Sequence, residues 1–200
     1  HFISTLDTLE LELERTPLER FVSELEGDMK ETLARLSDSH PRRFQAIVDI
    51  DGLSGTVELD TAYMGRIAHE LLVNAVKYSP EGSRILLSFE QSREVPGQNL
   101  EISVRNVPKA AQARDREGNR IVGIPYDYTE LVFDLFYTIE AFPVTIPEEE
   151  WSDGTGLYVV RKLLRRQGGW VKAENGVDYT GDTPQTFTRV AVTVPVEESS

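Results

Sequence analysis

The stretch HELLVNAVKYS, residues 69–79, closes a longer segment, residues 62–79, in which apolar residues recur at helical spacing. This spacing predicts an amphipathic helix that packs on a core, with a stripe made of Met64, Ile67, Leu71 and Ala75. Glu70, Asn74 and Lys77 lie at i, i+4 and i+7, so they share a different face. An ordinary solvated helix face can carry the same residues, so the polar stripe needs support from elsewhere.

A glycine-rich turn that opens into a helix gives that support. The sequence DGTGLYVVRKLLRRQGG spans residues 153–169, and its helix is expected over 156–167. Gly154 and Gly156 allow close backbone approach, and the N–H groups at a helix start attract phosphates. Alone, the turn could be a plain helix start. Paired with residues 69–78, it indicates an anion site between two helices.

The remaining pattern predicts an α+β fold. Helices are expected over residues 2–14 and 18–36, and strands over 43–50, 56–60, 84–91, 100–106, 170–175 and 186–196. The chain loses periodicity for about twenty residues after Pro108 and again over 143–153, as functional lids or disordered segments do. The helices are too few to cover both faces of a sheet. We therefore expect a two-layer sandwich with helices on one face of a mixed, mostly antiparallel sheet.

Composition narrows the classes of function. The 200 residues include 34 acidic and 21 basic side chains, a net charge of −13, which disfavours nucleic acid as a partner. The chain has no cysteine, which excludes disulfides and Cys-based zinc sites and fits a reducing cytoplasm. It contains no apolar run of the ~20 residues that a membrane helix needs. We expect a cytoplasmic domain, which a longer protein can attach to a membrane.

Three motifs in order carry a family resemblance. Residues 69–78 match an N-box, Gly154–Leu157 match a second glycine box, and VFDLFY at 132–137 is similar to the phenylalanine box of a lid. Over residues 43–196 the chain resembles the histidine-kinase branch of the GHKL ATPase superfamily, built on the Bergerat fold. The resemblance implies a catalytic domain that binds ATP and Mg²⁺, with its lid at about 107–153.

The resemblance also implies roles for individual residues. Asn74 would ligate Mg²⁺, and Glu70 would orient water or the attacking group near the metal, so these two are the catalytic candidates. Lys77 would reach a phosphate oxygen, and Tyr78 would lie against the adenine or ribose. The residues that would wrap the triphosphate are Gly154, Thr155, Gly156 and Leu157.

The first glycine box departs from the family pattern. The family has Asp-x-Gly-x-Gly after a strand, whereas this chain has Asn106 followed by Val-Pro-Lys-Ala. The Asn106 amide oxygen can accept a bond from the adenine amino group, but without charge. We therefore expect nucleotide binding weaker by roughly tenfold. In an alternative register, Gly123-Ile124-Pro125 is the remnant of the box and 107–122 is an insertion.

Domain boundaries and partners follow from the same resemblance. Residues 1–16 are expected to end a helical dimerisation and phosphoacceptor region, and 17–200 to form the catalytic domain. The acceptor histidine is expected outside this chain, since His1 and His40 look incidental. His69 either helps the reaction or has a packing or capping role. The implied partners are ATP, a histidine-bearing dimerisation domain of the same homodimeric protein, and a response regulator.

Two other functions remain open at this stage. One is a degenerate GHKL domain that serves as a phosphotransfer scaffold or protein-interaction module without binding ATP, which the altered first box favours. The other is a serine kinase of the anti-sigma type, which the helical lead-in disfavours.

Overall fold

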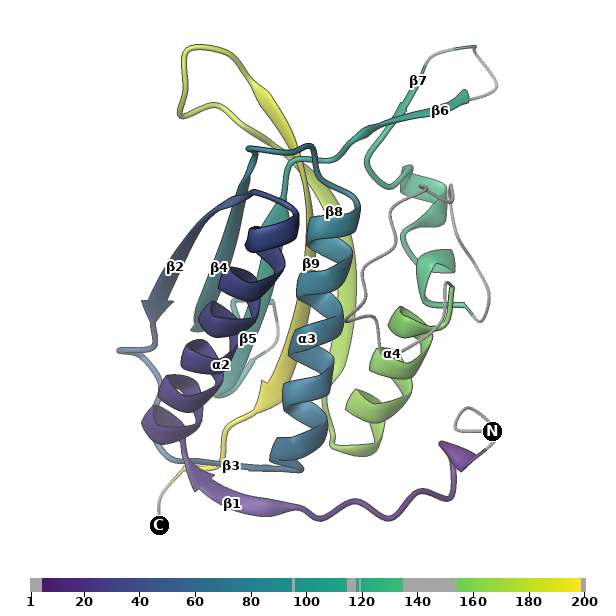
Figure 1. The fold of residues 1–200 in the computed structure, drawn as a ribbon. Coiled ribbons are helices and arrows are strands. Elements are labelled where there is room, and N and C mark those ends of the chain that lie inside the picture. The colour runs from purple at the N-terminus through teal and green to yellow at the C-terminus, as the bar shows by residue number, and fades with distance from the viewer. Residues whose placement is uncertain (1–4, 95, 115–117, 119, 135–153, 199–200) are drawn as a thin grey trace.

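The computed structural model describes residues 5–94, 96–114, 118, 120–134 and 154–198, which form a sheet covered by helices on one face (Figure 1). The five-stranded sheet has the order β2-β4-β5-β9-β8. Its strands are β2 (Arg43–Asp49), β4 (Arg84–Gln91), β5 (Asn99–Asn106), β8 (Trp170–Asp178) and β9 (Gln185–Pro195). β2 runs parallel to β4, and the other neighbours are antiparallel. The predicted mixed, mostly antiparallel sheet is therefore confirmed.

Three helices lie side by side on the covered face: α2 (Leu18–Ser39), α3 (Thr61–Lys77) and α4 (Gly156–Arg166) (Figure 1). α3 lies in the middle, and eight of its apolar residues are buried. Below it, Leu87 and Phe89 of β4 and Val192 of β9 are buried in the same core. The α+β fold class and the helices predicted at 18–36, 62–79 and 156–167 are confirmed.

The prediction of a helix over residues 2–14 is wrong from residue 6 onward. Thr5 is helical, residues 6–8 form a turn, residues 9–13 have no regular structure, and β1 (Glu14–Pro17) pairs antiparallel with β3 (Thr56–Leu59). Leu6 is buried, whereas Leu13 is 45% exposed, so the helical apolar stripe does not exist as one face. The backbone of Glu12 donates to the Asp60 carboxylate (3.0 Å), which draws this segment along the start of α3.

The region after Pro108 is more regular than its sequence indicates. β6 (Ala110–Arg114) and β7 (Arg120–Val122) form a hairpin, followed by the 3₁₀ turns η1 (Tyr126–Tyr128) and η2 (Leu131–Phe133). The second aperiodic stretch, 143–153, lies outside the described residues. Among the described residues, none of the helices combines the length and the apolar character that crossing a bilayer requires.

Candidate functional site

The predicted polar face of α3 meets the glycine turn directly. The Glu70 carboxylate is buried against Gly156, where any Cβ would collide with its Oε1 and Cδ atoms. Asn74 lies one turn along and donates from Nδ2 to both Oε1 (2.8 Å) and the backbone oxygen (2.9 Å) of Glu70. These bonds direct the amide nitrogen at Glu70 and leave the amide oxygen for another ligand.

The turn before α4 has the geometry of an anion-binding helix start. Gly154 has φ +77°, a left-handed conformation that favours glycine, and Thr155 is the buried residue that precedes the helix. The first N–H groups of an α-helix lack intrahelical acceptors and attract negative charge. Because Gly156 touches Glu70, this helix start, including the half-buried Leu157, lies beside the Glu70–Asn74 pair.

Lys77 is the last residue of α3, about one turn beyond Asn74, and Tyr78 follows it. Lys77 is buried, with its ammonium 5.9 Å from the centre of the Tyr78 ring. Lys109 follows β5 and binds this end twice: its backbone N–H donates to Tyr78 O and its ammonium to Lys77 O (both 2.8 Å). Burial, and then repulsion by Arg42, lower the pKa of Lys109. Cations thus gather at the carboxyl end of α3, which its dipole makes favourable.

Arg42 is a residue that sequence reasoning did not single out. It is only 9% exposed, and its guanidinium donates to Val76 O (2.9 Å), Ser79 O (2.7 Å) and Ser79 Oγ (2.8 Å). These oxygens belong to the last turn of α3 and the residues after it, where carbonyls lack helical partners. Arg42 therefore caps the helix end that carries Lys77 and Tyr78. In the sequence, only the doubled arginine after Pro41 could have hinted at this role.

Asn106, at the end of β5, lies against Thr188 of β9, which the sequence analysis also missed. The Thr188 hydroxyl donates to Asn106 Oδ1 (3.0 Å), and Asn106 Nδ2 donates to Val107 O (3.1 Å). Three residues later, Lys109 joins Tyr78, so the end of β5 is tied to the end of α3. Gly123, the glycine of the alternative register for the first glycine box, has φ +75° and lies next to Thr188. Both candidate positions of that box, Asn106 and Gly123, therefore lie beside Thr188.

Only the first half of the phenylalanine-box segment is described. Phe133 is buried, with the Arg161 guanidinium of α4 5.8 Å from its ring centre, and Arg161 also binds Asp134 Oδ1 (2.9 Å). Residues 135–137 lie outside the described residues. The basic run at 161–166 is thus partly engaged within the chain, with its two leucines buried as expected.

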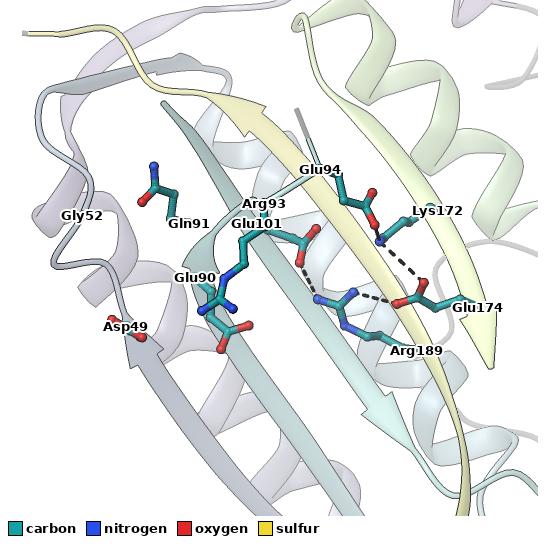
Figure 2. A pocket seen from close by; sticks show the side chains of 10 residues that line it. All are labelled: Asp49, Gly52, Glu90, Gln91, Arg93, Glu94, Glu101, Lys172, Glu174 and Arg189. Atoms are coloured by element: carbon teal, nitrogen blue, oxygen red, sulfur yellow. Dashed lines mark hydrogen bonds and ion pairs between the residues drawn. The ribbon is translucent and has the colours of Figure 1, made fainter. Parts of the chain in front are cut away.

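A polar hollow of about 430 Å³ lies on the opposite, helix-free face of the sheet (Figure 2). There Arg189 of β9 donates to Glu101 of β5 and to Glu174 of β8, and Lys172 pairs with Glu174 and Glu94. No residue singled out from the sequence lines this hollow. The candidate site is therefore the corner formed by α3, the start of α4 and the end of β5.

These features define a class of protein. A sequence profile of the histidine kinase-, DNA gyrase B- and HSP90-like ATPases matches residues 59–198. That match covers α3, α4 and four of the five strands of the main sheet. The chain belongs to this ATPase family.

The similar curated proteins are sensor kinases. The sensor histidine kinase WalK of Bacillus subtilis strain 168 is 28% identical over 142 residues, which cover 71% of this chain and 19% of WalK. The histidine-protein kinase/phosphatase MprB of Mycobacterium tuberculosis strain H37Rv is 28% identical over 160 residues, which cover 80% of this chain and 27% of MprB. The chain thus spans about a fifth to a quarter of the length of these relatives.

Solved structures of histidine kinases share the fold. The mycobacterial kinase MprB has a TM-score of 0.60 at 19% identity, over 93% of this chain and all of that one. Full-length ShkA in complex with AMPPNP has a TM-score of 0.65 at 18% identity, over 98% of this chain and 34% of that one. At these identities the likeness is one of fold.

The described side chains fit a magnesium ion that phosphates help to hold. In the part of the chain that the structure describes, there is no cluster of three or more His, Asp or Glu residues that could form an all-protein cage. Mg²⁺ usually takes only one or two protein oxygens and completes its shell with water and phosphate. The amide oxygen of Asn74 and the Glu70 carboxylate that binds the Asn74 nitrogen meet that requirement.

Proposed function

We propose that this chain is the catalytic, ATP-binding domain of a sensor histidine kinase, which passes the ATP γ-phosphate to a histidine outside the chain. The observation that carries the proposal is the contact between Glu70, held by Asn74, and Gly156 at the start of α4. It joins hard oxygen ligands and backbone N–H donors at one point. Phosphoryl transfer needs mainly positioning and charge neutralisation, which such groups supply.

Each candidate residue would have its own role in binding the nucleotide and the metal ion. Asn74 would hold Mg²⁺ through its amide oxygen, and the bound ion would neutralise charge that develops on the phosphates. Glu70 would orient the attacking group from its place behind Asn74. The backbone of Gly154, Thr155, Gly156 and Leu157 would cradle the triphosphate at the helix start. Lys77 would add positive charge, and Tyr78 and Asn106 would lie against the nucleoside.

Partners and compartment belong to the same proposal. The acceptor histidine would lie in a dimerisation domain of a homodimeric protein, and a response regulator would take the phosphoryl group. ThkA, a structural neighbour at 18% identity with a TM-score of 0.59, has been solved in complex with the response regulator TrrA. Because the reaction consumes ATP, we propose a cytoplasmic location for this domain.

A second candidate is a domain that has lost useful ATP binding and serves as a scaffold. The observation that favours it is at Asn106, where the family carboxylate is replaced by an amide that already accepts a bond from Thr188. An amide oxygen has a second lone pair, so this bond weakens the adenine contact without abolishing it. We therefore rank the scaffold below the kinase.

Titration calorimetry with ATP or a non-hydrolysable analogue, with and without Mg²⁺, separates the two functions. A kinase domain should bind in the micromolar to low millimolar range and more tightly with Mg²⁺. Asn74→Ala should lose the magnesium-dependent part of the affinity and keep the circular dichroism spectrum of the parent chain. No heat at millimolar nucleotide would favour the scaffold, and unchanged affinity in Asn74→Ala would show that the metal site lies elsewhere.

A further inference from the structure

Among the strands that the structure describes, none pairs with the outer edge of β2. β2 ends the sheet order, with β4 as its sheet neighbour, and it lies at the margin of the molecule in Figure 1. Three of its apolar side chains are unusually exposed: Phe44 (42%), Ile47 (39%) and Val48 (46%). A seven-residue apolar edge strand offers unpaired backbone groups as a template for another strand.

The pairing of β2 with β4 determines which backbone groups face outward. Arg43 lies opposite Arg84, and its N–H donates to Ser83 O (2.9 Å). Backbone groups alternate in a parallel ladder, so the odd-numbered residues of β2 face β4. The outward N–H and C=O groups therefore belong to Phe44, Ala46 and Val48.

We propose that this edge pairs antiparallel with the same edge of a second copy of the chain, about a two-fold axis at Ala46. Ala46 then faces Ala46 of the second copy, and Phe44 faces Val48 of the second copy. These are the outward residues, so each facing pair exchanges two N–H···O bonds, about six in all. The two sheets become one continuous sheet of ten strands.

Charge complementarity selects the second copy as the occupant. In this register Arg43 lies opposite Asp49 of the second copy, at both ends of the pairing and on the same face of the sheet. Among the described residues, Asp49 has no ion pair, and the Arg43 side chain has one hydrogen bond, from Nε to Gly82 O. Parallel pairing in register would instead place Arg43 opposite Arg43. The sequence RFQAIVD is thus complementary to itself only in the antiparallel sense.

The dimer should be weak and reversible. Stable interfaces bury about 1,200–2,000 Å² of surface in total. Two paired seven-residue strands bury an area at the low end of that range. Each copy also carries a charge of −13, which repels the other. Association is therefore best measured at about 0.15 M salt or above, where the screening length is about 8 Å or less. The proposal does not depend on ATP binding.

Disulfide trapping tests the register, because the chain has no cysteine of its own. Hydrogen-bonded antiparallel pairs have Cα atoms about 5.5 Å apart, within disulfide range, so Ala46→Cys should cross-link under mild oxidation. The expected product has twice the 22.6 kDa mass and disappears with reductant. Phe44→Cys is the matched control, because its copy lies about 13 Å away along the strand. No dimer from Ala46→Cys, or equal dimer from both variants, would overturn the register.

Sedimentation over a range of concentrations tests the pairing without cross-links. Wild type should shift from monomer toward dimer, whereas Arg43→Asp and Asp49→Arg should each weaken association by about tenfold. The double variant Arg43→Asp/Asp49→Arg should recover it. Val177→Lys, at an exposed position of the opposite edge strand β8, should leave association unchanged. A wild type that stays monomeric up to about 1 mM, or a double variant no better than the singles, would contradict the proposal.

Discussion

Asn106 and Thr188 show how single residues shape the nucleoside end of the candidate site. Thr188 donates to the amide oxygen of Asn106, and Asn106 Nδ2 donates to Val107 O. Both bonds hold the amide in one orientation at the end of β5. A carboxylate at 106 would accept the same Thr188 hydrogen bond and would add a negative charge for any donor on a bound base.

We expect Asn106→Asp to tighten ATP binding by roughly tenfold, because hydrogen bonds to charged groups are stronger than neutral ones. Calorimetric Kd values for ATP measure the effect. Asn99→Asp, the same change at the opposite end of β5, is the matched control and should leave the Kd unchanged. Affinity that stays equal or falls in Asn106→Asp would mean that residue 106 does not meet the base.

The contribution of the Asp178 side chain to the stability of the fold should depend on pH. The hydroxyl and backbone N–H of Thr180, together with Arg105, lower the pKa of Asp178 to about 2 from 3.8. Because the folded pKa is depressed, this carboxylate stabilises the fold fully above its unfolded pKa and loses the effect as the pH falls from about 4 to 2. The difference in unfolding free energy between wild type and Asp178→Asn should shrink across that window. A difference that stays constant down to pH 2.5 in urea titrations would contradict it.

At the scale of elements, both ends of α3 are fixed by polar residues from distant segments. At the start, the Asp60 carboxylate caps Tyr63 N–H (3.0 Å) and accepts from Glu12 N–H, while Asp60 N–H donates to the Gln167 side chain just after α4. At the other end, Arg42 binds the terminal carbonyls. The helix that presents Glu70 and Asn74 is thus held at two points outside its own sequence.

We expect Arg42→Ala to destabilise the fold by about 3 kcal/mol, because it removes three hydrogen bonds from the buried end of α3, including the one to the Ser79 carbonyl. For a chain of this size, that corresponds to a fall in Tm of roughly 6–12 °C. Differential scanning calorimetry or urea unfolding measures the loss. Arg35→Ala, at an exposed arginine of α2, is the control and should stay within about 0.5 kcal/mol of wild type. A loss no larger than that of the control would contradict the capping role.

At the scale of the whole molecule, a ligand that joins α3, α4 and the end of β5 should stabilise all three together. At a ligand concentration of about 100 Kd, binding to the folded state alone adds about 2.7 kcal/mol. Mg-ATP should therefore raise the Tm of wild type by roughly 5–10 °C. Asn74→Ala should show little of this rise, and adenosine, which lacks phosphates, should give less than ATP. Equal shifts with adenosine and Mg-ATP would exclude phosphate binding at the start of α4.

Most helices and strands of this chain could be predicted because the apolar periodicity that indicates them is local. Residues 84–91 and 170–175 alternate or cluster apolar side chains as strands do, and residues 62–79 repeat them as a helix does. The prediction of a helix at residues 2–14 failed for a physical reason. The apolar residues there fit a helical period, but the backbone instead forms hydrogen bonds with β3 and Asp60. Tertiary hydrogen bonds outweighed a weak local preference.

By itself, the sequence determined the α+β class, most of the helices and strands, and the glycine turn and polar stripe that identify the family. It could do so because periodicity, glycine placement and residue spacing act over a few neighbouring residues. Only the tertiary structure decided that Gly156 touches Glu70, that Arg42 caps α3, that Thr188 meets Asn106, and that β2 is an edge strand of the main sheet. These contacts join residues tens of positions apart, and no local pattern specifies which distant group a donor or a strand edge will reach.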